Sequence, residues 1–269
     1  MARVVAVANQ KGGVGKTTSA VNVAAALAAA EQRVLLVDAD PQGNATSGLG
    51  IARTSLQHTT YDALLGLCAP RDAILHSIQF KALDVMPATP DLAAAEIELV
   101  EVERREHAMR RALEPLRESY DVVLIDCPPS LGLITVNMLA AADGVLIPLQ
   151  CEYFALEGLS QLLNTIQLVQ RALNEHLVVD GVLLTMYDAR LNLSRQVAAD
   201  AREYFGDKVF ESVIPRNVRL AEAPSFGKPI ILYDVGSVGA VAYLNVAQEF
   251  MRRLGTSVLS EPRAHSSSV

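Results

Sequence analysis

The chain has 269 residues, of which 51% are hydrophobic and only 5% are aromatic, and its formal net charge is −7 at pH 7. This length and apolar content are enough to bury a large core in a single α/β domain. The negative charge argues mildly against a nucleic-acid partner, because non-specific DNA binding depends mainly on Lys and Arg that neutralise phosphates. The three cysteines are widely separated and odd in number, so they predict neither a metal site nor a disulfide framework: Cys68, Cys127 and Cys151.

Short apolar runs alternate with helical patterns along the whole chain. Strands are predicted at about 3–9, 33–38, 83–87, 120–126, 144–149, 178–186 and 209–214, and helices at 17–30, 91–117, 133–142, 155–174, 192–205 and 238–254. This alternation predicts a doubly wound, mainly parallel sheet flanked by helices, as one domain over residues 1–254. Residues 255–269 are expected to form a flexible polar tail, because they offer too little apolar surface to repay ordering.

A glycine-rich loop follows the first predicted strand. Residues 11–18 read Lys-Gly-Gly-Val-Gly-Lys-Thr-Thr. A glycine-rich turn that opens a helix supplies the closely spaced N–H groups, the cation and the hydroxyl that a triphosphate with Mg²⁺ requires. We therefore expect Lys16 to reach the β- and γ-phosphates and Thr17 to hold Mg²⁺. The usual pattern has Gly at the position of Gln10, so this loop is a variant, and Lys11 distinguishes it.

Acidic residues end two further predicted strands. Asp38 and Asp40 follow the apolar run 33–37, and Asp126 ends the run 120–125. In open α/β sheets, ligands bind beyond the carboxyl ends of the strands, so the glycine-rich loop, Asp40 and Asp126 should gather at one edge. Carboxylates at such an edge orient water and bind Mg²⁺ directly or through its waters.

The N-terminal region predicts no targeting or membrane segment. The first strand begins almost at Met1 and leaves no room for a signal peptide. The longest apolar stretch, residues 19–30, is too short to span a bilayer and is typical of a buried helix. We expect a protein that stays in the cytoplasm.

Four segments together resemble the deviant Walker ATPases of the ParA/MinD group: residues 11–18, 38–42, 124–129 and 215–224. Within this group the chain is most similar to the chromosomal ParA (Soj) proteins, from about residue 3 to residue 254. The resemblance implies the P-loop NTPase fold of that group and an ATP hydrolase that uses Mg²⁺ and forms a homodimer around ATP. It further implies that the dimer binds double-stranded DNA without sequence preference and releases it after hydrolysis. Segregation of a chromosome or plasmid on the nucleoid, with a ParB-type centromere-binding partner, is the implied role.

The resemblance also assigns roles to individual residues. The phosphates lie in a cradle made by Gly12, Gly13, Val14, Gly15 and Lys16, with Thr18 supporting the α-phosphate and Thr17 on Mg²⁺. Asp40 orients the attacking water, Asp126 acts on Mg²⁺ through water, and Lys11 crosses to the ATP of the second copy. Two residues contact adenine, Pro215 and Asn217, and two arginines match positions that bind DNA, Arg190 and Arg219.

Other members of the same superfamily give three alternatives. A MinD-like membrane switch requires an amphipathic terminal helix, and residues 238–254 do carry an apolar stripe, but packing of a final core helix explains that stripe more simply. An iron–sulfur electron carrier requires cysteines that Cys127 and Cys151 do not match. A plasmid-type ParA with its own operator-binding domain requires an N-terminal segment before the loop, and the loop begins at residue 11.

Overall fold

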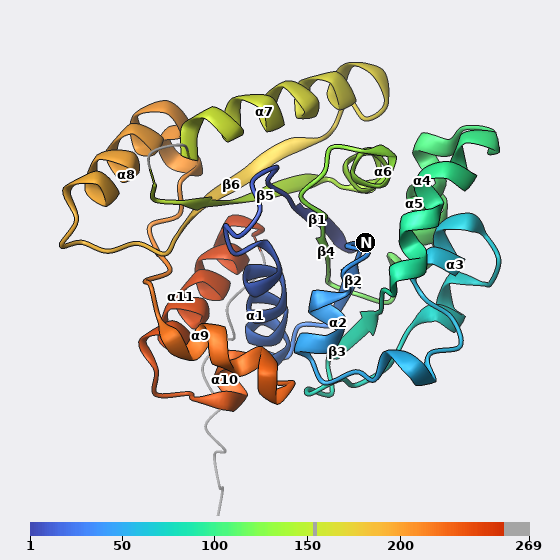
Figure 1. The fold of residues 1–269 in the computed structure, drawn as a ribbon, viewed down its shortest axis with the longest axis horizontal. Helices are drawn as coiled ribbons and strands as arrows, with labels where there is room; N and C mark the ends of the chain where they lie inside the picture. The colour runs from blue at the N-terminus through green and yellow to red at the C-terminus, as the bar shows by residue number, and fades with distance from the viewer. Residues whose placement is uncertain (153–154, 256–269) are drawn as a thin grey trace, which may run out of the picture.

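A parallel sheet of six strands forms the centre of the molecule in the computed structural model, which describes residues 1–152 and 155–255 and the side chains of all of these except 155–158 (Figure 1). All strand pairs are parallel. In spatial order the strands are β3 (Leu83–Met86), β2 (Val34–Asp38), β4 (Val122–Asp126), β1 (Arg3–Val7), β5 (Gly144–Gln150) and β6 (Val178–Thr185). The chain runs from β1 to β2 and β3 on one side, and after β4 it continues to β5 and β6 on the other. This reversal leaves a crevice beyond the carboxyl ends of β1 and β4.

Helices cover both faces of the sheet, and alternate residues of each strand serve the two cores. Val4 and Ala6 belong to one apolar cluster, and Val5 and Val7 belong to the other. The first cluster includes residues from α3 (Thr60–Leu65), α4 (Ala95–Glu98), α5 (Ala108–Leu113), α6 (Leu133–Ala141), α7 (Ala155–Ala172) and α8 (Asn192–Phe205). The second includes residues from α1 (Lys16–Ala29), α2 (Asn44–Gly48), α9 (Val218–Glu222), α10 (Ile230–Tyr233) and α11 (Val238–Arg253). The predicted doubly wound α/β fold is confirmed.

Helix α1 is buried over most of its length, as its composition predicts. Every residue from 19 to 28 is buried between the sheet and α11. A helix that is apolar on all sides requires such an interior position. The loop that precedes α1 is consequently held by a rigid element.

The predicted strand at 209–214 is wrong, because its pairing with β6 is interrupted. The segment runs parallel to β6, and the amides of Phe210 and Ile214 donate to carbonyls of that strand. Between them, the amides of Glu211 and Ser212 donate to the carboxylate of Glu249 on α11, both at 2.9 Å. Only isolated bridges therefore form at this edge.

The predicted single helix at 91–117 is also wrong. The structure has short pieces there: 3₁₀ turns at 90–94, 99–101, 105–107 and 114–116, besides α4 and α5. Val102 is extended, Arg104 adopts a left-handed φ of 51°, and Pro115 follows α5 without an N–H to donate. The periodic charges of this segment thus cover a curved surface rather than one helix.

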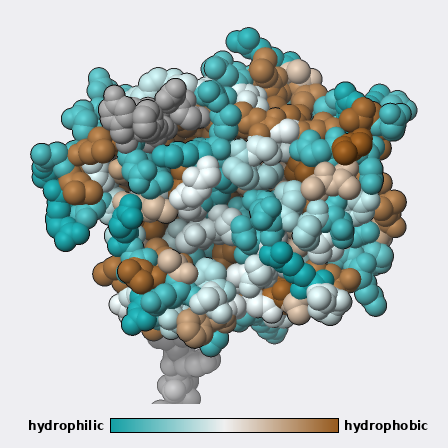
Figure 2. Space-filling view, in the orientation of Figure 1, coloured by the Kyte–Doolittle hydropathy of each residue, from teal (hydrophilic) through white to brown (hydrophobic). Residues whose placement is uncertain are grey.

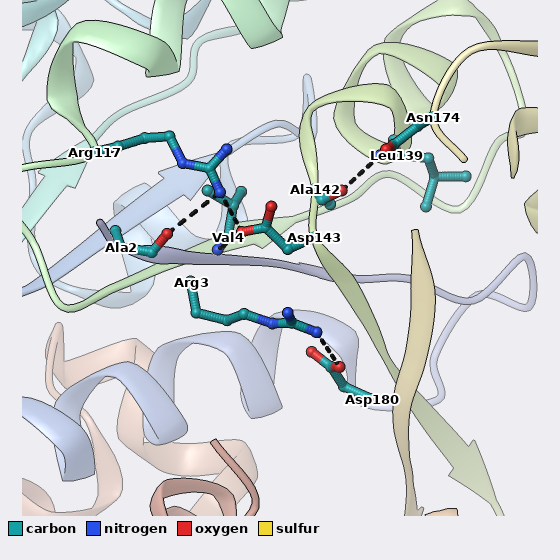
Figure 3. Close-up of polar contacts among 9 residues, drawn as sticks. All are labelled: Ala2, Arg3, Val4, Arg117, Leu139, Ala142, Asp143, Asn174 and Asp180. Carbon is teal, nitrogen blue, oxygen red and sulfur yellow. Dashed lines mark hydrogen bonds and ion pairs between the residues drawn. The ribbon is translucent and has the colours of Figure 1, made fainter. Parts of the chain in front are cut away.

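Charged pairs fasten the amino ends of the strands at the opposite edge of the sheet (Figure 3). Arg3 Nη2 lies 2.6 Å from Asp180 Oδ1, and Arg117 pairs with Asp143, which also accepts the amide of Val4. These contacts join neighbouring segments at the amino ends of the strands. The glycine-rich loop lies at the opposite edge, at the carboxyl ends.

The surface seen in the same orientation is mostly hydrophilic, and hydrophobic side chains form separate groups on it, one of them near α9 (Figure 2). Within the described residues, no helix is long and apolar enough to cross a membrane. Residues 256–269 of the predicted tail lie outside the described part of the chain.

Candidate nucleotide site

The glycine-rich loop joins β1 to α1 and requires glycine at two positions. Gly13 has a φ of +76° and Gly15 a φ of +89°, a conformation that L side chains rarely adopt. No heavy atom lies within 4 Å of the Cβ position at Gly12 or Gly13. The loop therefore presents its backbone to open space at the start of a helix, where N–H groups bind anions.

Lys16 is the first residue of α1, and its ammonium group lies inside the site. Lys16 is only 7% exposed, and its Nζ donates to the carbonyl oxygen of Lys11 at 3.2 Å. Burial lowers the pKa of Lys16, while the nearby carboxylates of Asp126 and Asp40 act in the opposite direction. A cation held this way is available to an anionic ligand without a large change in its surroundings.

Strand register brings the predicted carboxylates together. Asp126 at the end of β4 is paired with Asp38 on β2 on one side and with Val7 on β1 on the other. It therefore lies between Asp38 and the glycine-rich loop that follows β1. Asp126 is fully buried, and neither of its carboxylate oxygens has a hydrogen-bond partner among the described residues. Burial, together with the charge of Asp38, raises the pKa of Asp126 well above the ordinary range, while the nearby Thr17 side chain and the Lys16 ammonium act in the opposite direction.

This arrangement fits Mg²⁺. A buried carboxylate without partners is costly unless a cation or its bound water satisfies it. Oxygen ligands from one or two protein groups, with water completing the shell, are what Mg²⁺ prefers, and Thr17 and Asp126 supply such oxygens beside the loop. The residues present therefore suit the ion that the sequence predicts.

Asp38 and Asp40 have different surroundings. The Asp38 carboxylate accepts the amide and the hydroxyl of Thr46, at 2.8 and 2.7 Å, and so fixes the segment after β2. Burial raises the pKa of Asp38 to about 6. Asp40 is 7% exposed and accepts the amide of Gln42 at 2.9 Å. Asp38 thus holds the segment after β2 in place, whereas Asp40 accepts a single local hydrogen bond from Gln42.

Lys11 points toward the end of β5 rather than into its own loop. Its Nζ lies 3.5 Å from Glu152 Oε2, and its side chain is 33% exposed. Glu152 Oε1 also lies 3.7 Å from Arg216 Nη2, so one carboxylate faces two cations. No motif pointed to Glu152, because only the fold brings it beside Lys11.

An apolar cavity of about 350 Å³ adjoins the loop. It lies between the start of α1 and the segment that precedes α9, and it is lined by Gly15, Thr18, Thr185, Met186, Ile214, Pro215, Arg216, Asn217, Val218, Leu220, Ala221 and Tyr243. The amide oxygen of Asn217 is buried without a hydrogen-bond partner among the described residues. The structure thus brings Pro215 and Asn217 to the loop, as the sequence predicts. An apolar slot with one unpaired acceptor suits a flat heterocycle that carries an amino group.

Comparison with known proteins agrees with this geometry. A family model described as an AAA domain matches residues 2–179. The chain is 58% identical over 251 residues to the chromosome partitioning protein ParA of Myxococcus xanthus, an alignment that covers 93% of this chain and 88% of that protein. The chain belongs to the ParA/Soj family of ATPases. It is also 58% identical to the sporulation initiation inhibitor protein Soj of Bacillus subtilis, with 93% and 98% of the two chains covered.

A solved structure from Mycobacterium smegmatis shares the fold of this ParA/Soj chain. It is described as cobyrinic acid a,c-diamide synthase with bound ADP and magnesium, and it is 41% identical, with a TM-score of 0.83. The alignment covers 95% of this chain and 96% of that one.

The two arginines expected to bind DNA lie outside the phosphate site of this ParA/Soj chain. Arg190 is in the loop between β6 and α8, and its side chain is 88% exposed. Arg219 is in α9, with 54% of its side chain exposed. Both are paired with carboxylates of their own chain, which the sequence did not predict.

Three residues at and just after the end of β6 contribute to the site, and no sequence pattern indicated them. Thr185 Oγ1 donates to the carbonyl oxygen of Val14 at 2.8 Å, and Met186 lines the cavity with a left-handed φ of 50°. The amide of Tyr187 donates to the carbonyl oxygen of Ile214 at 3.0 Å. An unremarkable Thr-Met-Tyr at the end of a strand gives no signal, because its role depends on the neighbouring loops.

Proposed function

We propose that this ATPase is an ATP-driven dimerisation switch for DNA segregation. Its ATP-bound homodimer binds double-stranded DNA without sequence preference, and hydrolysis releases the DNA. The single observation that carries the nucleotide part is the buried, partnerless carboxylate of Asp126 beside the Lys16 ammonium and the glycine-rich loop. Such a site is complete only when an anion and a cation bind together.

Each part of the site has a separate task in ATP hydrolysis. The backbone of residues 12–15 and the Lys16 ammonium bind the phosphates, and Thr18 supports the α-phosphate. Thr17 would hold Mg²⁺ and Asp126 would hold a water bound to it; when bound, the ion would supply charge neutralisation for the phosphates. Asp40 orients the attacking water. In the cavity, the adenine ring of ATP packs on apolar side chains near Pro215, and the Asn217 side-chain oxygen accepts a hydrogen bond from the adenine amino group.

The dimer supplies what one chain lacks. Lys11 is partly exposed, and its contact with Glu152 at 3.5 Å is a long one, worth little on a surface. Lys11 can therefore leave Glu152 and reach the phosphates of a second copy, where it offsets the charge that develops on the transferred phosphoryl group.

DNA binding in this proposal uses Arg190 and Arg219. Both side chains are exposed, and a guanidinium group is well suited to phosphate. Because the net charge is −7, binding depends on a local basic surface, and a dimer doubles the number of phosphate contacts. A ParB-type centromere-binding partner and a cytoplasmic, nucleoid-associated location complete the proposal. They rest on family membership alone.

A MinD-like membrane switch is the second candidate. It requires a terminal amphipathic helix whose apolar side is free to bind a membrane, and the packing of α11 argues against this. Five apolar residues of its stripe are buried in the core beside α1: Tyr243, Val246, Ala247, Phe250 and Met251. The stripe of α11 thus has an intramolecular partner, and a membrane is not needed to cover it.

Fluorescence anisotropy of a random-sequence duplex, titrated with the protein under ATP and under ADP at two salt concentrations, tests the proposal. Salt-sensitive binding with ATP alone is the expected result. Arg190→Ala and Arg219→Ala should each weaken it and reduce the salt slope. Co-sedimentation with anionic liposomes, measured in parallel, is expected to be negative. ATP-dependent liposome binding without DNA affinity would replace this proposal with the membrane switch.

A further inference from the structure

Arg190 is held in a closed contact with Asp188 in its own loop. Its Nε and Nη2 donate to the two carboxylate oxygens of Asp188, at 2.9 and 2.7 Å. This is the bidentate geometry in which a guanidinium group also binds a phosphate. One of the two bidentate edges of the Arg190 guanidinium group is therefore occupied by a carboxylate of the same chain.

Asp188 can release Arg190 without being left unpaired. The backbone amide of Arg190 donates to Asp188 Oδ1 at 3.0 Å, a contact that does not depend on the arginine side chain. The hydrogen bonds from Arg190 lower the pKa of Asp188 to about 2, and the charge of Arg216 adds to this effect. When the guanidinium group swings away, that lowering is largely lost, but a carboxyl group with the ordinary pKa of aspartate is still ionised at neutral pH and Asp188 keeps the hydrogen bond from the backbone amide.

The second arginine expected to bind DNA has the same kind of partner. Arg219 Nη1 lies 2.9 Å from Glu222 Oε2, and its Nε lies 3.5 Å from Asp234 Oδ2. Both arginines are exposed and both are paired with acids nearby in sequence. Both arginines expected to bind DNA are therefore paired with carboxylates of their own chain before any DNA arrives.

We propose that Asp188 competes with DNA phosphates for Arg190, and that this competition weakens DNA binding and favours release. The inference rests on the proposed function, because it assumes that Arg190 contacts DNA. Asp188 also remains beside the arginine in the complex, where its charge repels the phosphate. Because the Arg190 side chain is largely exposed, the pair contributes little to stability, so the effect on affinity is modest and suits a protein that must release DNA.

The test compares apparent Kd values for a random-sequence duplex under ATP, measured by anisotropy at one fixed salt concentration. Asp188→Asn keeps the shape and one acceptor but removes the charge. We expect it to bind roughly two- to fivefold more tightly than the wild type. Asp207→Asn is the matched control, because it changes the net charge equally at an exposed residue in the turn after α8.

A double-mutant cycle then assigns the effect to Arg190. In an Arg190→Ala background, Asp188→Asn should give no gain beyond that of Asp207→Asn. The inference is overturned if Asp188→Asn binds no more tightly than Asp207→Asn, or if its gain persists without Arg190. It is also overturned if Asp188→Asn binds more weakly, since Asp188 would then orient Arg190 for DNA. A wild type that binds no DNA under ATP would instead refute the proposed function itself.

Discussion

Replacing Asp126 by Asn should stabilise the nucleotide-free protein and abolish its response to Mg²⁺. The Asp126 side chain is fully buried, and its oxygens have no hydrogen-bond partner among the described residues. An unpaired buried polar group costs about 1–3 kcal/mol, and more when it is charged. Asp38, its Cα partner on β2, adds repulsion between like charges. Asn keeps the shape and is still an unpaired polar group, but it removes the charge and the repulsion by Asp38, so we expect the free energy of unfolding to rise by about 1 kcal/mol or more.

Thermal unfolding without ligand, with ATP, and with ATP plus Mg²⁺ measures both effects. For a chain of this size, each kcal/mol shifts Tm by about 2–4 °C. The wild type should gain Tm when Mg²⁺ is added to ATP, and Asp126→Asn should not. Asp38→Asn is the matched comparison: its oxygen can still accept from Thr46, but its NH2 group then faces the amide of Asp40, so its gain in stability should be smaller than that of Asp126→Asn. A ligand-free Tm below that of the wild type, with the Mg²⁺ response retained, would refute the reasoning.

Three further predictions follow from the surroundings of single residues. Lys16→Ala should abolish ATP binding, whereas Asp40→Ala should keep it and slow hydrolysis by roughly 10²-fold or more; equal loss of nucleotide binding in calorimetry would remove the role of Asp40. Glu249→Ala should cost about 1–3 kcal/mol in urea unfolding, because it removes the acceptor of two part-buried amides and the carboxylate partner of Arg253, while the exposed Glu211→Ala should cost little. The free energy of unfolding of the nucleotide-free protein should rise by about 1 kcal/mol as the pH falls from 7 to 5. Burial raises the pKa of Asp38 to about 6, so its destabilising charge is lost over this range. A free energy of unfolding that does not change between these pH values would contradict this.

The parts of the site that the sequence predicted are those encoded by neighbouring residues. Gly13 and Gly15 are needed for local backbone angles, and α1 follows them directly, so the loop is visible in the sequence. The carboxylates of Asp38 and Asp126 end apolar runs, and parallel pairing then sets them side by side. In each case, local pattern and general topology were sufficient.

The parts that the sequence did not predict depend on contacts between distant segments. The segment 209–214 looks like a strand, but Glu249, far along the chain, takes the amides that a sheet would have used. Glu152 meets Lys11, and Thr185 meets Val14, only because β5 and β6 end beside the loop. Periodicity carries no information about these pairs.

The nucleotide part and the DNA part of the proposed function share one stretch of backbone. Thr185 is bonded to the glycine-rich loop, Met186 lines the cavity, and Tyr187 exchanges backbone hydrogen bonds with Ile214 and Arg216 on the other side of that cavity. Asp188 comes next in the chain, and it holds the guanidinium group of Arg190. Any ligand that moves the cavity wall therefore acts on residues within four positions of Arg190. If Arg190 contacts DNA as proposed, we expect this segment to be the route by which a change of nucleotide reaches it.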